Sequence, residues 1–227
     1  MGAKGAVTGI VAVGLVAVGA YVADGLARGS AEETAEQTVR QQVQVDGDLD
    51  VRIEGFPFLT QLARGSFDDV RATATSVVLD GLTVTDVTAD LRGASLEAPY
   101  RVRDVTVEAT VPTATVQQVV DERTSLDVGV EGDALRATGD VLGLEIGASL
   151  VPRVQDGRLL VDVEEVTLGA ATVDVTDLPG GLADRLQGVE VPVEGLPEGV
   201  RLTGATVVPQ GIRITAAGTD VALEDLS

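Results

Sequence analysis

The chain has 227 residues, contains no His, Cys or Trp, and carries a formal net charge of −20 at pH 7. Without His and Cys it lacks the usual ligands of zinc, haem and iron–sulfur sites, and neither a disulfide nor a Ser–His–Asp triad can form. The excess of carboxylates argues against a nucleic-acid partner, because phosphate binding needs a basic surface. We therefore expect no metal site, no cofactor and no nucleic acid.

The first predicted element is an N-terminal targeting segment. Lys4 precedes an uncharged, mostly apolar run from Ala6 to Ala23, which is close to the length that spans a bilayer and long for a signal peptide. Small residues at 18–20 (VGA) and 25–27 (GLA) offer cleavage sites. A cleaved signal and an uncleaved anchor both place the rest of the chain outside the cytoplasm. We expect residues 1–29 to be this segment. The protein is then exported to the periplasm or the outer face of the cytoplasmic membrane, which the segment contacts.

Residues 30–227 are predicted to form a single strand-rich domain. Helices are expected over Ala31–Val43, with Ser30 as N-cap, over Thr113–Arg123 and, for a short stretch, over Gly180–Gln187. Elsewhere apolar and polar residues alternate with a period of two, which is typical of strands that bury one face. The clearest alternation runs through residues 105–111, 142–150, 159–164 and 212–216.

Short turns connect the predicted strands into a mostly antiparallel meander, so the fold class is α+β. The turn sequences are Asp80-Gly81, Asp156-Gly157 and, less typical of a hairpin, Gln210-Gly211. A related heptapeptide follows each predicted helix: LDVRIEG at 49–55, LDVGVEG at 126–132 and VEVPVEG at 189–195. This echo indicates either a degenerate duplication of a helix and a meander or chance similarity in a chain of limited composition.

The segment VRIEGFPFLTQL at 51–62 contains two of the three Phe residues of the chain. Pro57 keeps the residue before it extended and suits the first turn of a helix. We expect Phe58, Leu59 and Leu62 to share one face of that turn. Such a cluster is a plug at one end of the core, the mouth of an apolar cavity, or a tip that dips into a membrane.

At this segment the sequence resembles the LmeA-like family of actinobacterial cell-envelope phospholipid-binding proteins. The resemblance extends from Ala31 to the C-terminus and includes the N-terminal apolar run. A second match lies at 196–202 (LPEGVRL) and 211–214 (GIRI). The residues that carry the first match are Ile53, Gly55, Phe56, Pro57, Phe58, Leu59, Thr60, Gln61, Leu62, Gly65 and Val70.

The resemblance implies phospholipid binding in the cell envelope and a tubular lipid-binding-like fold, a curved antiparallel sheet wrapped around one or two helices and an apolar tunnel. A sheet of Val, Ala and Leu fits this expectation, because small side chains leave space that hydrocarbon can fill. We expect a non-enzymatic protein that holds phospholipid acyl chains in an apolar cavity and supports assembly of envelope lipids or lipoglycans. The expected lipid-binding residues are Phe56 and Phe58 at the cavity entrance, Gln61 at a headgroup, and Pro57, Leu59, Leu62 and Phe67.

Two alternatives follow from the same sequence. The protein could be a membrane-tethered scaffold that holds a partner envelope enzyme. It could also be a carboxylate-dependent enzyme on envelope glycans, although Asp68-Asp69 and Glu164-Glu165 are adjacent on predicted strands and so face opposite ways. The segment DGDLD at 46–50 lacks the Gly and Glu of an EF-hand calcium loop. We expect neither catalytic residues nor bound calcium.

Overall fold

The computed structural model describes residues 24–41, 44–79, 81–97, 100–122, 124–141, 144–169, 171–177, 183, 186–193, 196 and 198–222. The apolar run Ala6–Ala23 and most of the predicted helix Gly180–Gln187 lie outside these residues. Among the helices that are described, none combines the length and the apolar character needed to cross a membrane.

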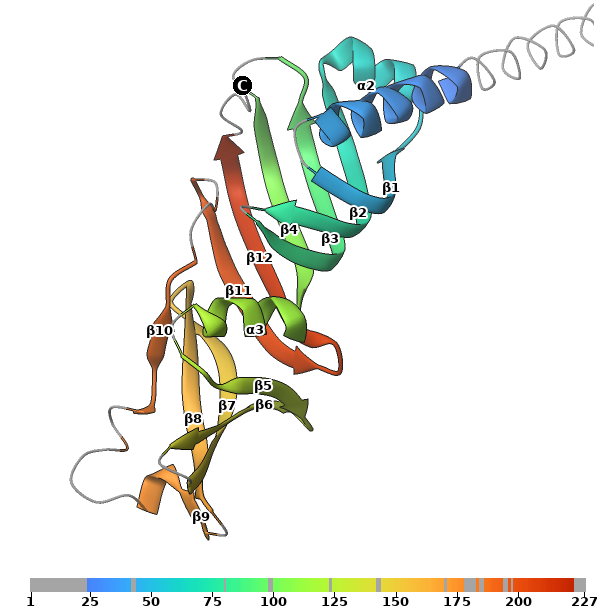
Figure 1. Cartoon of the computed structure of the whole chain (residues 1–227). Coiled ribbons are helices and arrows are strands. Elements are labelled where there is room, and N and C mark those ends of the chain that lie inside the picture. The colour runs from blue at the N-terminus through green and yellow to red at the C-terminus, as the bar shows by residue number, and fades with distance from the viewer. Residues whose placement is uncertain are drawn as a thin grey trace, which may run out of the picture.

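The strands form two open antiparallel sheets, which we call sheet A and sheet B (Figure 1). The order in sheet A is β1-β2-β3-β4-β12-β11, and in sheet B it is β10-β8-β7-β6-β5 with β9 beside β8. Sheet A contains β1 (Gln44–Glu54), β2 (Ser66–Leu79), β3 (Leu82–Ser95), β4 (Arg101–Pro112), β11 (Val200–Val208) and β12 (Gly211–Ala222). Sheet B contains β5 (Asp127–Glu131), β6 (Ala134–Val141), β7 (Leu144–Gln155), β8 (Arg158–Leu168), β9 (Ala171–Asp174) and β10 (Val189–Val191).

The predicted α+β class and its antiparallel meanders are confirmed, with β1–β4 and β5–β8 each running as a meander. Instead of one continuous meander there are two sheets, because the C-terminal hairpin β11–β12 returns to pair with β4. The sheets do not close into a barrel. The acidic segment at 46–50 forms a bulge in β1, where the register shifts between Asp46 and Leu49.

Helices lie at two places along sheet A (Figure 1). The chain is helical from Asp24 to residue 41, so Ser30 lies inside this helix. The prediction that Ser30 is the N-cap is therefore wrong. The expected boundary between residues 29 and 30 also falls within this helix. Helix α3 (Thr113–Asp121) confirms the second prediction and follows an extended Pro112.

The predicted hairpin turns are confirmed with one shift. Asp156 and Gly157 have φ of 52° and 76°, as a tight two-residue turn requires. Leu79 pairs with Leu82 across the first predicted turn. The third turn lies one residue earlier than expected, because Gly211 already pairs with Val208. Only glycine fits there, since a Cβ would stand 2.0 Å from the carbonyl oxygen of Val111.

Sheet A has one apolar and one polar face. On the apolar face the ends of the sheet are covered: the helix of residues 24–41 packs through Ala35 and Val39 onto β1 and β2, and sheet B packs onto β11 and β12. One cross-strand row illustrates the pattern, running through Val51, Ala72, Ala89, Val107, Ala216 and Leu202.

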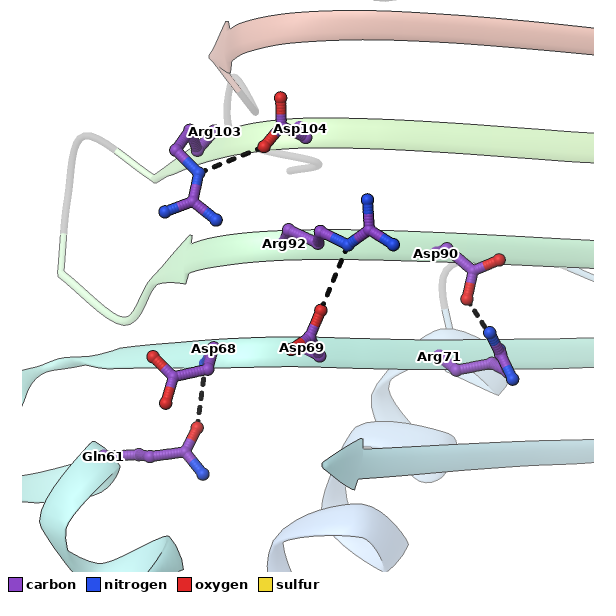
Figure 2. Close-up of polar contacts among 8 residues, drawn as sticks. All are labelled: Gln61, Asp68, Asp69, Arg71, Asp90, Arg92, Arg103 and Asp104. Atoms are coloured by element: carbon purple, nitrogen blue, oxygen red, sulfur yellow. Dashed lines mark hydrogen bonds and ion pairs between the residues drawn. The ribbon is translucent and has the colours of Figure 1, made fainter. Parts of the chain in front are cut away.

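The polar face of sheet A carries ion pairs between neighbouring strands (Figure 2). Arg71 lies 2.6 Å from Asp90, and Arg92 lies 3.3 Å from Asp69. All four side chains are more than a third exposed, so these pairs add little stability. These charged side chains make this face of the sheet suitable for exposure to solvent.

Helix side chains satisfy the backbone at one edge strand of each sheet. Glu36 accepts a hydrogen bond from the N–H of Val51 on β1 at 3.2 Å. Gln117 of α3 accepts one from the N–H of Val128 on β5 at 2.6 Å and donates to the carbonyl of Leu126 at 2.8 Å. Because unpaired edge groups invite aggregation, these bonds protect both edges while fixing the helices.

We predict that Gln117→Ala lowers the free energy of unfolding by about 1–3 kcal/mol, because it leaves the Val128 N–H without its partner. Urea denaturation measures the change. The matched control is Gln118→Ala, since Gln118 is the next residue of the same helix and is exposed. Equal effects of the two substitutions would contradict the proposed role of Gln117.

Candidate functional site

The aromatic segment folds as the short helix α2 (Phe58–Arg64), packed against the start of β2. Pro57 stands at its N-terminus in an extended conformation and supplies no side-chain cap. Gly65 ends the helix in the left-handed region, with φ of 71°, and its N–H bonds to the carbonyl of Leu62 at 3.1 Å. The orientation of α2 is therefore set by contacts with the rest of the fold.

Asp24 supplies the missing cap from a distant part of the sequence. Its carboxylate accepts a hydrogen bond from the N–H of Leu59 at 2.7 Å, and Arg28 lies 3.5 Å from its other oxygen. Burial opposes ionisation, but the N–H groups of Leu59 and Phe58 and the charge of Arg28 outweigh it, so the pKa of Asp24 is lowered. Arg28 also donates to the carbonyl of Gly55. These contacts tie the helix of residues 24–41 to α2.

The inward face of α2 is formed by Phe58 and Gln61. Phe58 is 1% exposed, and its ring stacks on Phe67 with centroids 5.6 Å apart. Gln61 is 2% exposed; its amide donates to the carbonyl of Glu54 at 3.0 Å and accepts from the N–H of Asp68 at 2.8 Å (Figure 2). Gln61 thus joins the end of β1 to the start of β2.

The outward face of α2 carries Leu59 and Leu62, which are 43% and 48% exposed, and Phe56, two residues before the helix, is 64% exposed. We call these three residues the apolar tip. The prediction that Phe58 shares a face with Leu59 and Leu62 is wrong. Phe58 faces inward because its ring stacks on Phe67, and Gln61 faces inward because its amide bonds to the backbone of Glu54 and Asp68. Phe58 is buried in the core, and the amide of Gln61 is engaged with Glu54 and Asp68. The lipid contacts predicted for the seven residues stay predictions.

Between its two covered ends, sheet A leaves an apolar strip. Ala89 pairs with Val107 and Leu91 pairs with Val105, and all four side chains are only partly buried. They lie between the cluster under the helix of residues 24–41 and the cluster shared with sheet B, and belong to neither. We call these four residues the central strip. Such a surface gains about 25 cal/mol for each Å² that a ligand covers.

The hollows on the surface have a different character. One of about 470 Å³ lies between the helix of residues 24–41 and β1, and its lining includes Arg28, Glu32 and Glu36. Another of about 450 Å³ is lined by residues that include Asp162 and Asp174. Charged side chains such as these do not suit hydrocarbon, whereas the four residues of the central strip are uncharged.

Two of the carboxylates around the second hollow, those of Asp162 and Asp174, are hydrogen-bonded within the fold. Hydrogen bonds from Arg153 and from the N–H of Gly188 lower the pKa of Asp162, against the effect of burial. The hydroxyl and N–H of Thr176 lower that of Asp174. A glycosidase acid needs a raised pKa, so these groups do not suit that role. Within the described ranges, no three His, Cys, Asp or Glu side chains are grouped to hold a metal ion.

We predict that Phe58→Ala and Phe56→Ala differ sharply in their effect on stability. Phe58→Ala empties a buried site and should cost about 3–5 kcal/mol. Phe56→Ala removes a mostly exposed side chain and should change stability by no more than about 0.5 kcal/mol. Denaturant unfolding of the two variants tests this, and a similar loss for both would show that Phe56 also belongs to the core.

We predict that the stabilising effect of Asp24 depends on pH. Because its pKa is lowered on folding from an ordinary value of 3.8, the ionised carboxylate stabilises the fold above pH 3.8 and this effect is lost as the pH falls through the folded pKa. The difference in unfolding free energy between the wild type and Asp24→Asn should be largest at neutral pH and vanish in acid. A difference that is constant with pH would refute the charge contribution.

Comparison with known proteins agrees with the resemblance seen in the sequence. The profile of a family described as LmeA-like phospholipid-binding matches residues 22–217, from just before the helix of residues 24–41 into β12. Searches of curated proteins and of solved structures found no match. The family match covers both sheets, α2 and the central strip, and the chain therefore belongs to the LmeA-like phospholipid-binding family.

Proposed function

We propose that this protein binds a phospholipid without changing it chemically, and that the acyl chains lie along the central strip. The observation that carries this proposal is the partly exposed apolar face in a member of a family described as phospholipid-binding. The strip consists of branched or small side chains on β3 and β4, without charge. It offers hydrocarbon contact but no polar group that would select a headgroup.

The energy of acyl-chain burial is sufficient for such binding. Each buried methylene contributes about 0.8 kcal/mol, so a dozen of them would contribute about 10 kcal/mol before the cost of ordering the chains. The helix of residues 24–41 and sheet B rise on either side of the strip. A ligand lying between them would be covered on both flanks without an enclosed tunnel.

We also propose that the protein is exported and acts in the cell envelope. Lys4 followed by the apolar run Ala6–Ala23 supports this. Asp24 adds a constraint, because cleavage after Ala27 would remove the carboxylate that caps α2. An uncleaved anchor, or cleavage after Ala20, keeps the cap, and the family match from residue 22 supports a domain that begins before Asp24.

A non-enzymatic role is supported by the side chains of the central strip. The four residues of the central strip carry neither a nucleophile nor a titratable group. A scaffold that holds an envelope enzyme would share this lack of catalytic groups, but it would not retain lipid. Bound phospholipid therefore distinguishes the proposal from the scaffold alternative.

We predict that Ala89→Phe reduces lipid retention because the added ring occupies the central strip. The measurement is native mass spectrometry of the full chain released from detergent micelles in the presence of phosphatidylglycerol. The matched control is Thr106→Phe, which places the same ring on the exposed, opposite face of β4 next to Val107. Urea unfolding of both variants shows that they are folded.

The wild type and Thr106→Phe should carry phospholipid, and Ala89→Phe should carry at least tenfold less, which corresponds to about 1.4 kcal/mol. Absence of lipid on the wild type would favour the scaffold alternative. Undiminished lipid on a folded Ala89→Phe variant would place the ligand elsewhere on the molecule.

A further inference from the structure

The apolar tip is an exposed patch at one end of sheet A, and neighbouring segments extend it. Leu26 is 70% exposed and lies two residues after Asp24, which bonds to Leu59. Tyr100 is 43% exposed and lies four residues after Leu96, whose N–H bonds to the carbonyl of Gly65 at 2.9 Å. Exposed large side chains are therefore gathered around α2.

The charge of the tip differs from that of the protein. Residues 55–67 (GFPFLTQLARGSF) contain no Asp or Glu, although the chain has 36 of them, and Arg64 is their single charged residue. A surface of this kind is not repelled by anionic headgroups, whereas most of the acidic chain would be. Arg64 is 53% exposed and pairs with Asp68 at 2.8 Å, so the charge on this surface is close to balanced. The tip is the part of this end of sheet A that suits a lipid surface.

The sequence brings the apolar run directly to the tip. Ala23, the last residue of that run, precedes Asp24, whose carboxylate is 2.7 Å from the backbone nitrogen of Leu59. A chain whose residues 6–23 are held in a bilayer would enter the folded domain beside the tip. In that case the hydrogen bond of Asp24 would hold the tip close to the membrane.

We propose that the apolar tip docks into the interfacial layer of a phospholipid bilayer, with Phe56, Leu59 and Leu62 among the lipids. Docking would also bring the central strip, where we propose that lipid binds, close to the bilayer that supplies the lipid. Ser66, directly after Gly65, pairs with Ser95 of β3, and Leu91 of the central strip lies four residues from Ser95. At about 3.3 Å per residue this is about 13 Å. The idea that a lipid moves from the bilayer at the tip to the central strip rests on the proposed function, whereas the docking of the tip does not.

The absence of Trp from the chain allows a direct test. Leu59→Trp places a single fluorophore on the tip and keeps its apolar character. The matched control is Leu168→Trp, because Leu168 is exposed to a similar extent, 49%, at the end of β8 in sheet B. The full chain is reconstituted into vesicles of phosphatidylcholine and phosphatidylglycerol, and emission is compared with vesicles whose acyl chains are brominated.

Docking predicts a blue-shifted emission for Trp at position 59 and at least twofold quenching by brominated lipid, with neither effect at position 168. Quenching at position 59 must persist with Ala89→Phe in the same chain, which separates bilayer contact from a lipid bound on the central strip. Unquenched emission at position 59 would overturn the proposal. A blue shift at position 59 without quenching by brominated lipid would overturn it in favour of a second copy or another segment of the chain covering the tip.

If the quenching at position 59 disappears only when Ala89→Phe is present, the tip contacts the bound lipid and not the bilayer, and docking is wrong while the lipid site stands. If Ala89→Phe retains lipid in mass spectrometry and position 59 is still quenched, the lipid site is wrong while docking stands. The two proposals therefore fail separately. A folded chain is verified for each variant by its urea unfolding curve.

Discussion

The alternation of apolar and polar residues along sheet A is the constraint on which the rest of the structure depends. It places the apolar rows that run through the central strip on one face, where the helix of residues 24–41 and sheet B also pack. These two covers meet the sheet at opposite ends of its strand order. Because the chain is only 2% aromatic, the side chains between them are too small to complete the core. The central strip is the result, and it is the surface on which we propose that lipid binds.

Both halves of the molecule use the same device to join a helix to a sheet edge. Val51 and Val128 occupy the same place in LDVRIEG and LDVGVEG, and each backbone N–H bonds to a polar side chain of the preceding helix, Glu36 or Gln117. In each half the helix is followed by an edge strand and a meander. This shared arrangement favours duplication over chance as the origin of the sequence echo. The third echo begins in β10, for which no such bond is described.

Much of the fold could be predicted from the sequence, because strands with one buried face show a period of two and tight turns need particular residues. The division into two sheets could not, since it depends on which strand the hairpin β11–β12 joins. At the candidate site, Phe58 was misplaced because a seven-residue helix has too little periodicity to show its inner face. The role of Asp24 as the cap of α2 could not be predicted, because Asp24 directly follows the apolar run Ala6–Ala23 and its partner Leu59 is 35 residues away. Alternation indicated the apolar face of β4, but not that its middle stays uncovered.

The central claim is that acyl chains lie on the middle of sheet A, and contacts between lipid and protein methyl groups measure this directly. Methyl-labelled full chain in fully deuterated detergent, given a protonated phospholipid, should show nuclear Overhauser effects from acyl protons to Leu91, Val105 and Val107. These residues are partly exposed on β3 and β4, between the two core clusters. Contacts that appear only at residues outside the central strip, or no contacts while the lipid is bound, would contradict the account.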